Sequence, residues 1–341
     1  MAAISLRGLT KKFAEQTAVN AVEMEIEDGR FVAILGPSGC GKTTIMNMIA
    51  GLELPTAGTI FFNGKDVTSV AAADRGVGFV FQNYAIFTHM TVDENLGFGL
   101  DVTGVPRLER DKKVADMASF MSLEHRLKQK ASSLSVNEMQ KLAIGRSAIV
   151  QPGIFLLDEP LSNLDAAFRE RMRSELRTLQ RRLKQTMVYV THDQIEAMGL
   201  ADKIAVMNLG VLQQFATPQE IYTNPANTFV AKFIGAPSMN IVRMKNVHQT
   251  KPEVETLIGF RPENVRLGEG DETCHTFKSR VTFVEIVSGR KIVHLNANGE
   301  EILAVMGRGF VSNEGELVIA HVIAADCRYF DGATGAALAR A

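Results

Sequence analysis

The sequence predicts a mainly parallel α/β domain followed by a small all-β domain. Unbroken apolar runs, which are typical of strands buried on both faces, alternate with helical patterns in the first part: Phe31-Val32-Ala33-Ile34-Leu35, Ile154-Phe155-Leu156-Leu157 and Met187-Val188-Tyr189-Val190. After Gly235-Ala236-Pro237, short strand-like pieces alternate with Gly and Asn turns. We therefore expect two domains, at residues 1–235 and 236–341.

Composition supports this division and excludes several classes of protein. At about 150 residues per domain, 341 residues predict about two domains. Lys and Arg number 37 against 38 Asp and Glu, which argues against a polybasic chain that coats nucleic acid. No apolar run approaches the ~18 residues of a membrane span, so a membrane role would be peripheral. The three cysteines, Cys40, Cys274 and Cys327, lack metal-ligand spacing and predict a reducing compartment.

Local patterns predict the individual elements of the first domain. Residues 4–26 alternate as strands do, and Asp28-Gly29 is a hairpin-turn signal before the first buried run. Residues 44–52, 107–130 and 166–185 have helical patterns, and the last of these is amphipathic.

A glycine-rich loop lies between the first buried run and the next predicted helix. It fits the pattern G-x-x-x-x-G-K-[ST] with Gly36, Pro37, Ser38, Gly39, Cys40, Gly41, Lys42 and Thr43, and Thr44 follows. The glycines allow backbone N–H groups to face phosphates, and the helix adds the positive end of its dipole. We expect Lys42 to reach the β- and γ-phosphates of a nucleoside triphosphate and the Thr43 hydroxyl to bind Mg²⁺.

Cys40 within this loop has two interpretations. It is a small residue that fits the turn, or it is a thiol whose pKa the helix N-terminus lowers. The second interpretation predicts that alkylation of Cys40 blocks nucleotide binding.

Polar residues follow the other apolar runs directly. Asp158 and Glu159 come after the second run, and His192 comes after the third. Because ligands bind at the carboxyl edge of a parallel sheet, we expect Asp158 to hold Mg²⁺, Glu159 to polarise the attacking water, and His192 to contact the γ-phosphate. Gln82 follows the run Val77–Phe81 and can present its amide to Mg²⁺ or to that water.

These pieces, in this order, resemble the ATP-binding subunit of an ATP-binding cassette (ABC) transporter over nearly the whole chain. The resemblance implies a P-loop NTPase domain that binds ATP and Mg²⁺, with a helical subdomain at about 84–152 that meets the permease. It implies that Gln82 lies in a Q-loop, that Asp165 belongs to the D-loop Ser162-Asn163-Leu164-Asp165, that His192 is the switch histidine, and that Phe13 stacks on adenine.

The second half is similar to the sugar and sugar-alcohol importer branch of that family. The segments that carry this similarity are Thr217-Pro218, Asn224-Pro225-Ala226-Asn227, Phe233-Ile234-Gly235 and Phe260-Arg261-Pro262-Glu263-Asn264. The resemblance implies an OB-like (TOBE-type) regulatory domain at the C-terminus. It also implies an ATPase at the cytoplasmic face of the bacterial inner membrane, with two transmembrane permease subunits and an external solute-binding protein. A sugar, a polyol (glycerol is favoured) or glycerol phosphate would be the solute.

One motif departs from the family pattern. The signature Leu-Ser-Gly-Gly-Gln, which in the family presses on the ATP held by a second subunit, is replaced here by Leu134, Ser135, Val136, Asn137 and Glu138. A β-branched side chain stands where backbone must approach phosphate, and Glu138 adds a negative charge there. We therefore expect a heterodimer with a second ATPase subunit that carries a regular signature, rather than a homodimer with two impaired sites.

Two other functions fit parts of the sequence. An ABC-type ATPase that acts on nucleic acid would use the OB-like tail and an arginine-rich helix; the near-neutral charge and the interspersed acids Glu170 and Glu175 oppose it, and we expect no nucleic-acid partner. The arginines are Arg169, Arg171, Arg173, Arg177, Arg181 and Arg182. A non-catalytic nucleotide sensor would explain the altered signature, but a sensor has no need of Glu159.

Overall fold

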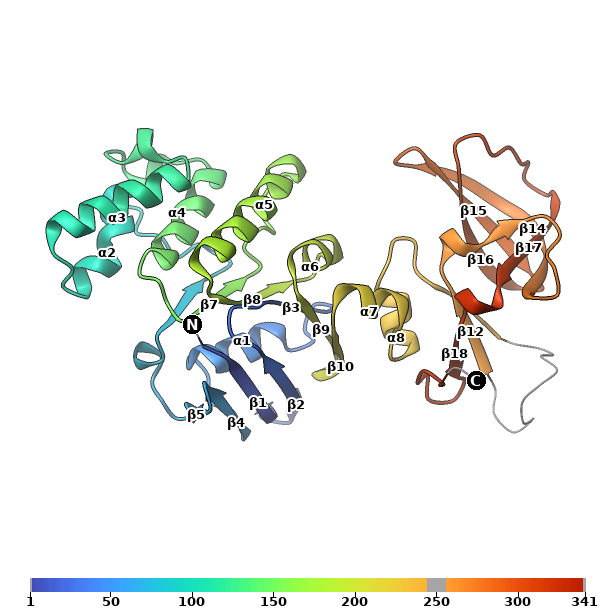
Figure 1. Ribbon diagram of the computed structural model, residues 1–341, viewed down its shortest axis with the longest axis horizontal. Coiled ribbons are helices and arrows are strands. Elements are labelled where there is room, and N and C mark those ends of the chain that lie inside the picture. Colours follow the sequence, from blue (N-terminus) through green and yellow to red (C-terminus); the bar gives the residue numbers. More distant parts are fainter. Residues whose placement is uncertain (1, 244–255, 340–341) are drawn as a thin grey trace. The chain divides into compact units, whose positions relative to one another are not determined.

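A computed structural model describes residues 2–243 and 256–339 (Figure 1). The chain divides into two compact units, Met1–Pro218 and Gln219–Ala341. Among the described residues, no helix is long and apolar enough to cross a membrane.

The first unit contains a six-stranded central sheet. Its order is β10 (Val211–Ala216), β9 (Lys203–Asn208), β3 (Phe31–Leu35), β8 (Thr186–Thr191), β7 (Ile154–Asp158) and β6 (Val77–Val80). All neighbouring strands are parallel except β10, which runs antiparallel to β9. The carboxyl ends of β3, β8, β7 and β6 therefore lie along one sheet edge.

A second, antiparallel sheet belongs to the same unit. Its order is β2 (Gln16–Ile26), β1 (Ile4–Phe13), β4 (Ala57–Phe62) and β5 (Lys65–Asp66). The hairpin predicted at Asp28-Gly29 is wrong, because β2 pairs with β1 while β3 pairs with β8 and β9. The apolar sequence of β3 places it in the interior of the central sheet, and this burial overrides the local turn signal.

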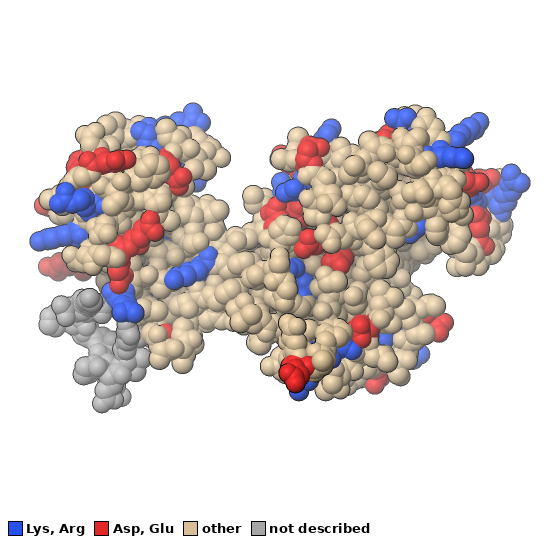
Figure 2. Space-filling view, turned by 180° about the vertical axis from the view of Figure 1, so that it is seen from behind, with Lys and Arg blue, Asp and Glu red and all other residues tan. Residues whose placement is uncertain are grey.

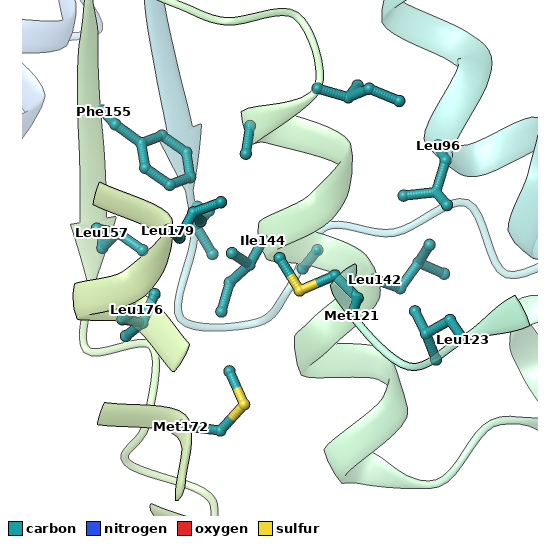
Figure 3. Packing of buried hydrophobic residues seen from close by; sticks show 14 of the residues in the cluster. Leu96, Met121, Leu123, Leu142, Ile144, Phe155, Leu157, Met172, Leu176 and Leu179 are labelled. Carbon is teal, nitrogen blue, oxygen red and sulfur yellow. The ribbon is translucent and has the colours of Figure 1, made fainter. Parts of the chain in front are cut away.

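Helices cover both faces of the central sheet. Along β7, Ile154 and Leu156 pack in the cluster that contains α1 (Lys42–Ala50), whereas Phe155 and Leu157 pack in the cluster that contains α5 (Ala166–Leu183). Figure 3 shows Phe155 and Leu157 beside leucines of α5. This alternation explains why the strand sequence is continuously apolar. The short helix α6 (Gln194–Leu200) follows β8.

Three further helices form a group of their own. They are α2 (Val92–Val102), α3 (Arg107–Phe120) and α4 (Val136–Ala148), which lie together in Figure 1 within the range predicted for a helical subdomain. Leu96, Met121 and Leu142 pack between them (Figure 3). A capping box begins α2: the Thr91 hydroxyl accepts a hydrogen bond from Glu94 N–H, and the Glu94 carboxylate accepts one from Thr91 N–H.

The second unit is mainly antiparallel β, as predicted. One sheet has the order β11 (Asn240–Arg243), β12 (Thr256–Phe260), β18 (Arg328–Asp331). The other has the order β13 (Arg266–Leu267), β17 (Leu317–Ile323), β14 (Cys274–Val287), β15 (Arg290–Ala297), β16 (Glu300–Met306). Both sheets contribute to one core, which includes Phe260, Val281 and Leu295.

The division between the units lies at Pro218/Gln219 rather than near residue 236. Two short helices, α7 (Pro218–Thr223) and α8 (Thr228–Phe233), are attached to the β-rich unit by the buried guanidinium of Arg261. Arg261 donates hydrogen bonds to the carbonyl oxygens of Tyr222, Ala231 and Ile234. The onset of short strand-like segments in the sequence marks where helices are followed by strands. Hydrogen bonds between residues far apart in the sequence decide which unit the two helices belong to.

Candidate active site

Four loops meet at the carboxyl edge of the central sheet. The glycine-rich loop follows β3, and His192 follows β8. Asp158 is the last residue of β7 and Glu159 follows it, while Gln82 lies just beyond β6. Because these four strands are neighbours in the order β3-β8-β7-β6, residues from distant parts of the sequence share one edge. This is the edge at which parallel α/β sheets bind ligands.

The glycine-rich loop is closed by its own lysine. The Lys42 ammonium donates hydrogen bonds to the carbonyl oxygens of Gly36 and Pro37, both at 2.9 Å. Gly41 has a φ of +96°, and a Cβ there would lie 2.4 Å from the Ala18 carbonyl oxygen. The pattern G-x-x-x-x-G-K therefore describes a backbone shape that a larger residue at Gly41 could not adopt.

The start of α1 fits a phosphate group. The residue at its N-cap is Gly41, no side chain caps the helix, and its first turn contains no acidic residue. The first backbone N–H groups of a helix have no partner within the helix, and the dipole favours an anion there. Thr43 and Thr44 lie in this first turn, as the proposed contacts with ATP require.

The predicted magnesium-binding residues are only partly brought together. The Thr43 hydroxyl donates a hydrogen bond to Asp158 Oδ1 at 3.2 Å. Burial raises the pKa of the Asp158 carboxyl, and the neighbouring Glu159 adds to this, whereas Thr43 and Lys42 oppose it. A hydroxyl and a carboxylate side by side suit the oxygen preference of Mg²⁺. Gln82 lies on an exposed turn at the same sheet edge.

Glu159 and His192 form a pair from adjacent strands. His192 Nδ1 lies 3.2 Å from Glu159 Oε2. Glu159 has a φ of +43°, in the left-handed region, and its N–H donates to the Val190 carbonyl. Such backbone strain persists only where the surroundings hold it, as at catalytic sites. The Glu159 carboxylate thus lies against His192 at the sheet edge, where the sequence predicts a water-polarising carboxylate and a contact to the γ-phosphate.

Phe13 lies at the end of β1, where the β1–β2 hairpin turns. Its ring is 47% exposed, and the Lys11 ammonium lies 4.9 Å from the ring centroid. An exposed aromatic ring with a cation beside it can stack on a purine base. This position is compatible with the predicted contact to adenine.

The structure favours the simple interpretation of Cys40. The thiol is 2% exposed, and burial raises its pKa, although Lys42 opposes this. A buried neutral thiol is a poor nucleophile, so the lowered pKa considered from the sequence is wrong.

We expect N-ethylmaleimide at pH 7 to alkylate Cys40 at least about tenfold more slowly than free cysteine, because the buried site hinders the reagent and the raised pKa of the thiol lowers the thiolate fraction. Peptide mass spectrometry measures this, with the half-buried Cys274 as the internal comparison. Rapid labelling of Cys40, together with loss of ATP binding that Cys40→Ser prevents, would contradict the expectation.

The altered signature forms the start of α4. Ser135 is the N-cap, and it forms a capping box with Glu138: Ser135 N–H donates to Glu138 Oε2 at 2.9 Å, and Ser135 Oγ accepts from Glu138 N–H at 3.3 Å. Val136 is 45% exposed. The unscreened negative charge expected at Glu138 is absent, because Arg126 Nε lies 2.8 Å from Glu138 Oε1. The sequence contains no local signal for this pair, which spans twelve positions.

Two interactions connect the D-loop to its surroundings. Asp165 caps α5 by accepting a hydrogen bond from Phe168 N–H, which lowers the pKa of the Asp165 carboxyl. Arg169 donates to the Leu164 carbonyl and lies 3.3 Å from Asp193, the residue after His192. The sequence contains no local signal for this connection, because Arg169 and Asp193 are 24 positions apart.

Two of the arginines on helix α5 form ion pairs with acidic residues of the same unit. Arg177 is paired with Asp202, and Arg169 with Asp193. Over the face of the whole molecule seen in Figure 2, Lys and Arg side chains lie scattered among Asp and Glu. These pairs weaken the case for a nucleic-acid-binding stripe on α5.

Comparisons with known proteins show the family to which the chain belongs. A family model described as ABC transporter matches residues 19–162. The sn-glycerol-3-phosphate import ATP-binding protein UgpC 2 of Agrobacterium fabrum is 40% identical over 98% of this chain and 94% of its own length. The chain belongs to the ABC transporter ATP-binding proteins. A UgpC of Brucella abortus is 42% identical over 98% of this chain and 99% of its own.

A solved structure supports the same fold for the ABC domain. The protein cbiO1 of Clostridium perfringens, part of the ABC transporter complex cbiONQ, aligns with a TM-score of 0.60 and 25% identity. The alignment covers 64% of this chain and 89% of that one. The family expected from the sequence is confirmed, and this ABC ATPase uses ATP and Mg²⁺ and hydrolyses ATP.

Proposed function

We propose that this chain is the ATP-hydrolysing subunit of an importer for a small polyol of the glycerol class, either free or phosphorylated. The observation that carries the ATPase function is the Glu159–His192 pair beside the Thr43–Asp158 hydrogen bond at one sheet edge. The solute class is supported by relatives that are sn-glycerol-3-phosphate import ATP-binding proteins. A nucleotide sensor would not need a strained Glu159 next to His192.

The subunit works at the cytoplasmic face of the inner membrane. Two transmembrane permease subunits form the passage, and an external binding protein delivers the solute. Closure of two ATPase subunits on ATP moves the permeases through the Gln82 to Gly99 region, and hydrolysis resets them. The solute itself contacts the permeases and the binding protein rather than this chain.

Catalysis rests on positioning and electrostatics. Lys42 and the start of α1 bind the phosphates, and Phe13 binds the base. Thr43 and Asp158 would hold Mg²⁺, which would supply positive charge to neutralise the phosphate oxygens. The Glu159 carboxylate orients the attacking water and accepts its proton, while His192 holds the γ-phosphate end of the site.

We further propose that the two ATPase subunits of the assembly differ. The exposed Val136 side chain, and a Ser135 hydroxyl that is engaged by Glu138, make this chain's signature a poor surface for the ATP of a facing subunit, while its own phosphate loop and Glu159 are complete. A sibling with a regular signature would complete one efficient site, built on the Walker residues of this chain. A homodimer would contain two impaired sites.

Reconstitution in liposomes tests both proposals. The permeases and binding protein are assembled with this chain alone, or with this chain and the sibling ATPase, and ATP hydrolysis and uptake of labelled glycerol, glycerol phosphate and maltose are measured. We expect brisk turnover only with both ATPases, and uptake of a glycerol-class solute. Brisk turnover and uptake with this chain alone would reject the heterodimer, and stimulation by maltose alone would reject the solute class.

A further inference from the structure

The signature of this chain contains a charge pair. The Glu138 carboxylate is held by Arg126, whose Nε donates to Glu138 Oε1 at 2.8 Å, and His125 Nε2 lies 3.9 Å from the same oxygen. Arg126 Nη1 also donates to Gln129 Oε1 at 2.8 Å, so the guanidinium is fixed at two points. Glu138 side-chain exposure is 20%, which makes the pair better shielded than an ordinary surface ion pair.

The other carboxylate oxygen of Glu138 accepts a hydrogen bond from the Ser135 hydroxyl. Ser135 Oγ lies 2.8 Å from Glu138 Oε2 and donates its proton to it. A hydroxyl has one proton, so Ser135 cannot donate to a phosphate while this contact is made. Partial burial raises the pKa of the Glu138 carboxyl, but the hydrogen bonds from Ser135 and Arg126 together lower it. The carboxylate is therefore ionised and fully engaged within its own chain.

The pair matters because of what a signature faces. In the proposed dimer the start of α4 approaches the ATP of the other subunit, whose phosphates are negative. An unpaired Glu138 at that place would repel them, whereas the Arg126–Glu138 pair has no net charge. Arg126 thus offsets the charge that distinguishes this signature from the family pattern.

We propose that Arg126 is a positioning residue that holds the Glu138 carboxylate against Ser135 and so allows the altered signature to close on ATP in the facing subunit. The half-site formed by this signature then retains nucleotide but lacks the serine contact that a regular signature makes. This inference rests on the proposed pairing of two ATPase subunits, but it does not require that they differ.

A double-mutant cycle in the assembled transporter tests the proposal. Variants Arg126→Ala, Glu138→Gln and the combination of both are titrated with a fluorescent ATP analogue, and the half-saturating concentration is measured at low and high salt. We expect Arg126→Ala to raise this concentration about tenfold at low salt and less at high salt, because the released charge is screened. In the Glu138→Gln background the same change should have little effect.

Two further variants separate positioning from a general structural role. Arg126→Lys keeps the charge and should largely restore the wild-type value, whereas Arg107→Ala removes a 94% exposed arginine of the same subdomain and should change nothing. An equal effect of Arg126→Ala in both Glu138 backgrounds, or no effect at all, would overturn the proposal.

The outcome is independent of the heterodimer. In an unlike pair the shift should affect one of the two bound nucleotides, and in a homodimer both. The number of bound nucleotides whose affinity changes therefore shows whether the two ATPase subunits differ. The difference between the effects of Arg126→Ala in the two Glu138 backgrounds tests the role of Arg126.

Discussion

Replacing Glu159 by glutamine is expected to slow steady-state ATP hydrolysis by the assembled transporter by about 10²–10⁴-fold. The amide keeps the size of the side chain but cannot accept the proton of the attacking water. The strained backbone at φ +43° and the neighbouring Thr43–Asp158 contact should be unchanged, so ATP binding should persist. Phosphate release and binding of a fluorescent nucleotide measure the two effects separately.

The same substitution in the sibling ATPase provides the comparison. If only the site built on this chain is efficient, the change in the sibling should be milder. Glu170→Gln, which removes an exposed acid of α5, is the matched control and should leave hydrolysis unaltered. Equal losses from both Glu changes would argue against an asymmetric pair, and retained hydrolysis in Glu159→Gln would remove Glu159 from the catalytic role.

Replacing Arg261 by alanine is expected to lower the free energy of unfolding of the second unit by about 3–5 kcal/mol, through unsatisfied buried carbonyls and a cavity. Arg261 is 4% exposed and donates to three carbonyl oxygens on α7, α8 and the residue after α8. Its guanidinium also lies 4.0 Å from the ring centroid of Tyr222. Without the guanidinium these carbonyls lose their partner and the space beneath Tyr222 is empty.

Urea unfolding followed by circular dichroism measures this effect, since the chain has no tryptophan to report by fluorescence. Arg266→Ala removes an exposed arginine of the same unit and should change stability by less than about 0.5 kcal/mol. A similar small change for Arg261→Ala would show that α7 and α8 are not held by this side chain.

Sequence reasoning correctly predicted where the motif residues lie, because each of these short motifs directly follows a buried strand. The phosphate loop, Asp158, Glu159 and His192 each follow an apolar run, and parallel strands bring such ends to one edge. Continuous apolarity also identified β3, β7 and β8, because both faces of these strands are buried.

What could not be predicted depends on contacts between distant side chains. Nothing near Arg126 or Glu138 in the sequence indicates that their side chains meet. Arg261 attaches α7 and α8 to the second unit, so the division between the units lies before the point where strand-like segments begin in the sequence. The hairpin predicted at Asp28-Gly29 is wrong because a turn motif indicates only the local backbone geometry. Which strand β3 pairs with is decided by the burial of its apolar side chains, and this places β3 beside β8 rather than β2.

The Arg169 guanidinium joins the D-loop to the turn after β8, because it donates to the Leu164 carbonyl and lies 3.3 Å from Asp193. A displacement of the D-loop would therefore pull on the turn that carries His192. Contact of a neighbouring subunit with the D-loop would in this way change the position of a histidine that the neighbour does not touch.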